Sequence, residues 1–211
     1  MKENIEKNNE RIKEFRSDDC YVAFIDILGF KNLVKEMPID DIVNMFHRID
    51  YSNKNTGIYH NTNNELKAVV DRRELHYKIM SDSVVIYIDA NVENALQGLI
   101  LYCSFFQSNL LTCIDRPILC RGGISRGELY VDGEIICGKG LVGAYELESN
   151  AAIFPRVVIP LKLVDECGLD KCGHRIYENV YKEDGFYVTN YIMNTISFAK
   201  ENDQLFEKRK R

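Results

Sequence analysis

Two apolar runs in the sequence each carry a single aspartate at their edge. Residues 21–25 end at Asp26, and Asp82 stands between the apolar residues 79–80 and 84–86. Such short apolar runs predict buried strands. Because an unpaired buried carboxylate costs several kcal/mol, each aspartate must meet a partner, a metal ion or water. On neighbouring strands the two carboxylates can bind Mg²⁺ or Mn²⁺ and so handle a triphosphate.

Length and charge narrow the class of protein. A chain of 211 residues is long enough for one domain with a sizeable core. A net charge of -5 gives it no general attraction for nucleic acid. The sequence has no apolar run near the roughly 20 residues that span a bilayer, and residues 1–19 lack a signal-peptide core. We therefore expect a cytoplasmic protein without a nucleic-acid or membrane partner.

The hydrophobic pattern predicts alternating strands and helices. A buried strand at 20–26 precedes a helix that begins at Asp40, and two strands at 74–80 and 83–88 precede an amphipathic helix at 92–113. Further strands follow. This order favours an α+β fold of the split βαβ or ferredoxin-like type, with a mostly antiparallel sheet and helices on one face.

Three segments are expected along the chain. Residues 1–18 are predicted to form a charged N-terminal helix, 19–165 the main domain, and 166–211 a C-terminal extension that ends in a helix at 188–207. A helix is also expected at 138–149, within the main domain.

A turn follows the first aspartate. Gly29 breaks the strand and lets the backbone come close to a ligand, and the segment 28–31, which opens a helix, offers N–H groups to phosphate oxygens. In the alternative interpretation, Asp26 and Asp82 only cap a helix and a turn.

Three motifs carry a resemblance to a known family. Phe-Ile-Asp-Ile-Leu-Gly-Phe at 24–30 resembles the first metal motif of class III nucleotide cyclases. Lys-Ile-Met-Ser-Asp at 78–82 resembles their second, Lys-x-x-Gly-Asp, with Ser81 in place of glycine. Arg-Gly-Gly-Ile-Ser-Arg-Gly at 121–127 is similar to their Arg-x-Gly-Ile-x-x-Gly strand. The likeness spans about residues 20–160 and implies that the main domain is a cyclase catalytic domain.

Two further motifs, Ala-Tyr-Glu-Leu-Glu-Ser at 144–149 and Phe-Pro-Arg-Val-Val-Ile at 154–159, bring the chain closest to the pyrimidine cyclases of bacterial Pycsar antiphage systems. That resemblance implies a homodimer with active sites at the interface and two Mn²⁺ or Mg²⁺ ions in each. It also implies conversion of UTP, or alternatively CTP, to 3′,5′-cyclic UMP or CMP and pyrophosphate. The product would activate a separate effector protein.

The resemblance also assigns roles to single residues. It implies that Asp26, Asp82 and the Ile27 carbonyl bind the metal ions, and that Gly29 and Phe30 form the turn that touches the phosphates.

Other substrate contacts carry alternatives. The resemblance matches Arg121 to an arginine on the triphosphate, although by residue type it is also a surface arginine on a strand. By the resemblance, Lys78 falls where purine cyclases place a base-reading residue. Here it either reads a pyrimidine carbonyl or forms only a surface ion pair. Phe24, with Tyr21, either narrows the pocket against a purine or is a core residue.

One departure leaves the function open. Purine cyclases carry Asn and Arg on the last catalytic helix, and residues 141–147 have neither. We expect Arg156 to supply the missing catalytic charge, with Arg126 as the second choice. Two rival hypotheses are a degenerate homologue that only binds nucleotide or dimerises, and a purine cyclase, which Lys78 favours.

Overall fold

The computed structural model describes residues 14–55, 59–62, 65–68, 70–112, 117–166, 180–193 and 195–196. Its main element is an eight-stranded sheet. In spatial order the strands are β4 (His76–Met80), β5 (Ser83–Asp89), β1 (Phe15–Ile27), β6 (Cys120–Val131), β8 (Val157–Pro160), β10 (Phe186–Thr189) and β9 (Val180–Glu183), with β7 (Ile136–Cys137) also paired to β6. A separate hairpin is made by β2 (Tyr59–Thr62) and β3 (Glu65–Ala68), and Arg72–Glu74 form a 3₁₀ turn.

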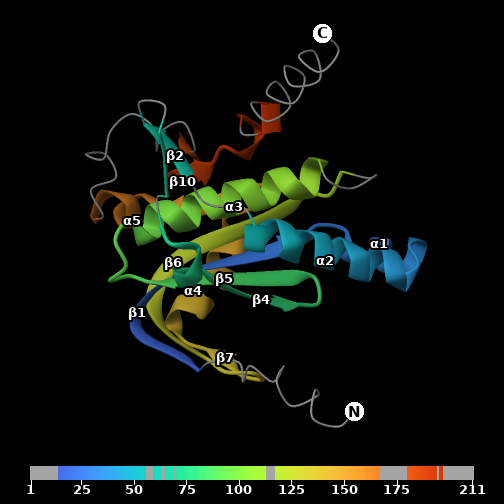
Figure 1. Cartoon of the computed structure of the whole chain (residues 1–211), viewed down its shortest axis with the longest axis horizontal. Helices are drawn as coiled ribbons and strands as arrows, with labels where there is room; N and C mark the ends of the chain where they lie inside the picture. The colour runs from blue at the N-terminus through green and yellow to red at the C-terminus, as the bar shows by residue number, and fades with distance from the viewer. Residues whose placement is uncertain are drawn as a thin grey trace.

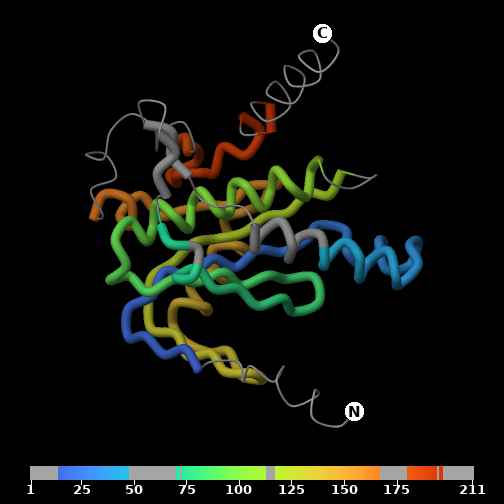
Figure 2. Tube along the Cα trace, in the orientation of Figure 1, coloured from blue at the N-terminus to red at the C-terminus, as the bar shows by residue number. Residues whose placement is uncertain are grey.

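The strand order matches the predicted architecture. In the order β4-β5-β1-β6, the earliest strand of the chain, β1, lies between β5 and β6. The pairs β4–β5, β5–β1 and β1–β6 are all antiparallel. The pair β6–β8 is parallel. Figure 2 shows β1 in blue between the green β4–β5 hairpin and the yellow β6. The α+β class and the mostly antiparallel sheet are therefore confirmed.

One face of the sheet is covered by the larger helices. Ala23 and Ile25 of β1 are buried in a core that also contains side chains of α3 (Ala95–Thr112) and α2 (Ile39–Asn55). The short helix α1 (Phe30–Glu36) adds Phe30 at the edge of the same core. Figure 1 shows α3 lying along the sheet, with α2 and α1 beside it.

The opposite face is covered by α4 (Lys139–Asn150). Val22 and Phe24, which alternate with the residues of the first core, belong to a second core that contains Ala144 of α4. The helix approaches β6 closely, since a Cβ on Gly123 would lie 2.4 Å from the Cβ of Leu147. The prediction of helices on one face is thus wrong for α4. Periodicity identifies the apolar stripe of a helix, but not the face of the sheet that the stripe covers.

The ends of the main domain also differ from the prediction. Strand β1 already begins at Phe15, so residues 15–18 are strand, while residues 1–13 of the predicted N-terminal helix lie outside the described residues. After α5 (Leu161–Glu166), β9 and β10 continue the main sheet from within the predicted C-terminal extension. The predicted helix at 188–207 is wrong at 188–189, which are strand, whereas residues 191–193 and 195–196 are helical. Residues 194 and 197–207 of this prediction lie outside the described residues.

Among the described residues, no helix combines the length and the apolar composition needed to cross a membrane.

Candidate active site

The two motif aspartates lie at one end of the central strands. Asp26 is the second-last residue of β1, and its Cα partners are Ser83 of β5 and Arg121 of β6. The next residue, Ile27, donates its backbone N–H to the carbonyl oxygen of Asp82 over 2.8 Å. The fold therefore brings together two residues that are far apart in the sequence.

The turn that carries Asp82 has an unusual backbone. Ser81 lies in the left-handed region with φ of 56°, a conformation that costs about 1–2 kcal/mol for a residue other than glycine. Position 81 is the one where the cyclase motif has glycine. Glycine adopts this conformation without the steric cost that Ser81 bears.

The environment of Asp26 is short of positive charge. Burial raises the pKa of the Asp26 carboxyl, and the nearby negative charges of Glu148 and Asp82 raise it further, while Arg121 opposes the shift. The Nε of Arg121 lies 3.8 Å from Oδ2 of Asp26, beyond hydrogen-bond distance. The carboxylate of Asp26 therefore has two other carboxylates near it, those of Glu148 and Asp82, but only the guanidinium of Arg121 to oppose them.

Glu148 is the site residue that sequence reasoning missed. Its side chain is only 4% exposed, and its Oε1 lies 2.6 Å from Nε of Arg121. The hydroxyl of Ser149 donates a hydrogen bond to its other oxygen over 2.8 Å. A signal was present, because Gly140, Ala144 and Glu148 recur every four residues and form the buried stripe of α4. An acid on such a stripe needs a cation beside it.

The residues present fit a hard divalent cation. In the described part of the chain, no three His, Cys, Asp or Glu side chains form a metal-binding group. Mg²⁺ commonly binds through one or two carboxylates and completes its shell with water and substrate phosphates. Asp26 and Asp82 supply oxygen ligands of this kind. Burial, and after it the negative charges of Glu148 and Asp82, raise the pKa of Asp26 and so disfavour its carboxylate form, which a cation would stabilise.

The predicted phosphate turn has the expected backbone. Gly29 has φ of 76° and precedes α1, and its carbonyl accepts hydrogen bonds from the N–H groups of Asn32 and Leu33. The ring of Phe30 packs toward Phe46, with 5.9 Å between centroids. The glycine thus redirects the chain just after Asp26, while the neighbouring side chain anchors the turn in the core.

The two predicted base contacts lie on the α4 side of the sheet. The ring of Phe24 meets that of Tyr145 edge to face at 5.4 Å. The ammonium of Lys78 donates to the carbonyls of Asp132 at 3.3 Å and Gly133 at 3.5 Å, so it ties β4 to the β6–β7 turn. Neither interaction is the surface ion pair that the sequence offered as the alternative for Lys78. In contrast, Tyr21 is buried in the core on the opposite face.

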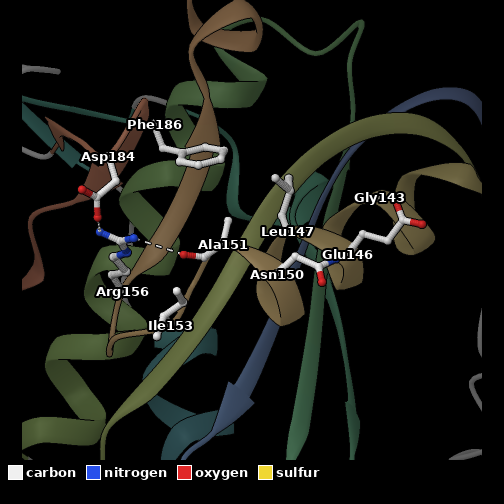
Figure 3. A pocket seen from close by; sticks show the side chains of 9 residues that line it. All are labelled: Gly143, Glu146, Leu147, Asn150, Ala151, Ile153, Arg156, Asp184 and Phe186. Atoms are coloured by element: carbon white, nitrogen blue, oxygen red, sulfur yellow. Dashed lines mark hydrogen bonds and ion pairs between the residues drawn. The ribbon is translucent and has the colours of Figure 1, made fainter.

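The side chain of Arg156 is paired with two acids of the β9–β10 hairpin. Its guanidinium is almost fully buried and forms ion pairs with Glu183 at 2.7 Å and Asp184 at 2.9 Å. It also donates to the carbonyl of Ala151 over 3.1 Å. Arg156 and Asp184 line a cavity of about 600 Å³ together with Glu146 and other residues of α4. In Figure 3, Arg156 and Asp184 lie on one side of this cavity and Glu146 lies on the other.

The second-choice arginine lies toward the other end of the strands. Arg126 forms an ion pair with Asp19, and its Cα partner is Tyr21. Because Tyr21 precedes Asp26 by five residues, the two positions are about 17 Å apart along the strand.

Several solved nucleotide cyclase domains share this fold. The catalytic core of a rhodopsin-guanylyl cyclase with converted specificity, in complex with ATPαS, matches with a TM-score of 0.58 at 12% identity, over 84% of this chain and 98% of that one. The guanylate cyclase domain of RhGC from Catenaria anguillulae, in complex with GTP, matches with a TM-score of 0.56 at 13% identity, over 84% and 96%. The adenylyl cyclase CyaB from P. aeruginosa matches with a TM-score of 0.51 at 16% identity, over 84% and 95%.

These similarities define the fold of the chain as that of nucleotide cyclase domains. No family model matches the sequence, and no curated protein sequence does.

Proposed function

We propose that this protein is a metal-dependent nucleotide cyclase. In the reaction, the ribose 3′-oxygen attacks the α-phosphorus, pyrophosphate leaves, and a 3′,5′-cyclic nucleotide forms. The observation that carries the proposal is the adjacency of Asp26 and Asp82, through the hydrogen bond from Ile27 to the Asp82 carbonyl, in a fold shared with cyclase domains.

In this proposal the chain provides three kinds of contact. Asp26, Asp82 and the carbonyl of Ile27 would bind two Mn²⁺ or Mg²⁺ ions. When bound, the ions would lower the pKa of the attacking hydroxyl and stabilise charge on the phosphates. Gly29 and Phe30 would present backbone N–H groups to the triphosphate. An obligatory side-chain base is not required.

Arg121 would complete the triphosphate site. It faces Asp26 across the β1–β6 pair and is 29% exposed, so its guanidinium can meet both solvent and a ligand.

Arg156 would have to leave Glu183 and Asp184 before it could stabilise the transition state. Turnover by Arg156→Gln tests this role. A loss of 10²-fold or more in kcat with an unchanged KM is expected of a catalytic arginine, and an unchanged kcat excludes it.

We propose UTP as the substrate, with CTP as the alternative, on the strength of the motif resemblance. Phe24 and Lys78 lie on the α4 side of the sheet and would contact the base. The same resemblance supports a homodimer with active sites at the interface, and a cyclic product that acts on an effector in antiphage defence. Two of the neighbours were solved in complex with ATPαS and GTP, which keeps a purine cyclase as a rival. Competition between UTP and ATP for turnover decides between them.

A second candidate function is a nucleotide-binding module without turnover. The ion pairs that occupy Arg156 favour it, as does the lack of Asn and Arg at 141–147. Nucleotide binding at ample Mn²⁺ without any product would identify this case.

The direct test is incubation of the purified protein with each of the four nucleoside triphosphates and Mn²⁺, followed by mass spectrometry of the products. We expect a 3′,5′-cyclic product that disappears in Asp26→Ala and persists in Glu146→Gln, which removes an exposed acid of α4. Absence of product from all four substrates would contradict the proposal.

A further inference from the structure

Glu148 and Asp26 compete for the same guanidinium. Nε of Arg121 lies 2.6 Å from Oε1 of Glu148 and 3.8 Å from Oδ2 of Asp26. Glu148 comes from α4 and the other two residues are partners across the β1–β6 pair, so α4 adds a third charge to a cross-strand pair. The shorter distance shows that Arg121 is paired with Glu148 and not with Asp26.

Burial explains why Glu148 wins this competition. The Glu148 side chain is 4% exposed, whereas Asp26 is 25% exposed and can be partly solvated by water. A buried carboxylate that water does not solvate depends more on its counter-ion than a carboxylate that is partly exposed to water. The hydroxyl of Ser149 satisfies the second oxygen of Glu148 and helps to fix its direction.

Without Glu148, Arg121 would have one carboxylate left beside it. Directly opposed residues of an antiparallel pair have Cβ atoms about 5 Å apart, so a small rotation would bring the guanidinium onto Asp26. A guanidinium paired with Asp26 would oppose a divalent cation on the same oxygens, because both charges are positive.

We propose that Glu148 is a positioning residue that keeps Arg121 away from Asp26 and so leaves the charge of Asp26 and Asp82 for a divalent cation. This inference rests on the proposed function, because it concerns the proposed metal ligands. It assigns to the buried acid of α4 an effect on metal affinity that is exerted through the arginine and not by ligation.

The test is Mn²⁺ binding to the full chain without nucleotide, measured by the electron paramagnetic resonance of free Mn²⁺. The binding that counts is the part that Asp26→Asn removes. Glu148→Gln keeps the size of the side chain and removes its charge, and we expect it to weaken this binding about tenfold. Glu146→Gln, a neighbouring exposed acid on the same helix, is the matched control and should change it less than twofold.

The double variant Arg121→Gln/Glu148→Gln separates positioning from direct ligation. Removal of the competing cation should restore Mn²⁺ affinity to within threefold of the wild type. A double variant as weak as Glu148→Gln, or a Glu148→Gln affinity equal to that of the wild type, overturns the inference. The melting temperature of each variant establishes that it is folded.

The result is separable from the fate of the proposed function. A wild type that binds no Mn²⁺ through Asp26 overturns both the inference and the metal-dependent reaction. A wild type that shows the expected pattern of Mn²⁺ binding, yet forms no cyclic nucleotide, overturns the proposed function alone.

Discussion

Two arginines of this protein each meet two carboxylates, with opposite consequences. Around Arg156, both distances are short, at 2.7 and 2.9 Å, and the acids Glu183 and Asp184 are 46% and 63% exposed. Around Arg121, one distance is 2.6 Å and the other 3.8 Å, and the acids are the buried Glu148 and the partly buried Asp26. In the Arg156 cluster the buried charge is that of the arginine, whereas in the Arg121 cluster the buried charge is that of Glu148.

The difference indicates what each cluster does. The guanidinium of Arg156 joins the β9–β10 turn to the loop before β8, through two solvated acids and the Ala151 carbonyl, and this arrangement suits a structural link. In the cluster at Arg121, burial and the charges of Glu148 and Asp82 together raise the pKa of the Asp26 carboxyl, and the single guanidinium does not offset them. A surplus of negative charge in a partly open place is typical of a cation site.

The largest expected effect concerns activity. Asp26→Asn and Asp82→Asn should each lower cyclase turnover about 10³-fold, because metal-ion stabilisation of a reacting phosphate is worth several kcal/mol. Asp184→Asn, which removes an acid from the other cluster, should leave turnover within about threefold. Rates measured with saturating Mn²⁺ check this contrast. Equal losses at Asp26 and Asp184 would mean that the two clusters do not differ in kind.

The next effect concerns stability. Arg121→Gln leaves the buried Glu148 without a counter-ion and should lower the free energy of unfolding by about 3 kcal/mol. Arg156→Gln leaves two acids that water can solvate, and it should cost about 1 kcal/mol. Urea unfolding of both variants measures the difference. If Arg156→Gln is the more damaging change, burial of the acid is not what separates the clusters.

The strands that carry the aspartates could be predicted from the sequence. The apolar residues 21–25 and 84–86 indicated buried strands, and the predicted helices at 92–113 and 138–149 correspond to α3 and α4. Local patterns suffice there, because each segment shows its own period. The face that α4 covers could not be predicted in this way, since it depends on contacts such as that of Gly123 with Leu147.

The partners of the arginines were beyond local pattern. Arg156 meets Glu183 and Asp184, 27 and 28 residues later, through a hairpin that the sequence reasoning did not expect to join the sheet. Arg121 meets Glu148 only because α4 crosses the end of β6. Charge pairing between distant segments follows from tertiary packing, which no short window of sequence contains.

A smaller effect concerns pH. Because the pKa of Asp26 is raised in the folded protein by burial, Glu148 and Asp82, its native form keeps a proton that the unfolded chain loses. Stability from this group therefore falls as the pH rises from the ordinary value of 3.8 through the raised folded value. Asp26→Asn, which resembles the protonated side chain, should be more stable than the wild type above that range, and the gap should close below pH 3.8.

Thermal unfolding of both proteins from acidic to neutral pH measures this gap, with Glu146→Gln as a control for the loss of a surface acid. A gap that does not change with pH would show that folding does not raise the pKa of Asp26, so that Arg121 offsets both burial and the neighbouring acids.

The smallest expected effect concerns the stability of two turns, the one that carries Asp82 and the one that carries Asp184. Ser81, beside Asp82, has φ of 56°, and Asp184 has φ of 50°. Ser81→Gly removes a left-handed conformation that costs the folded protein about 1 kcal/mol. Glycine also raises the entropy of the unfolded chain, which offsets part of this gain, so we expect the free energy of unfolding to rise by about 0.5 kcal/mol. Asp184→Gly relieves less, because aspartate tolerates this conformation, and it loses the ion pair with Arg156, so a loss of about 0.5 kcal/mol is expected. Urea unfolding gives both signs. A gain in Asp184→Gly would mean that the acid contributes no stability through Arg156, and the Arg156 cluster would no longer qualify as a structural link.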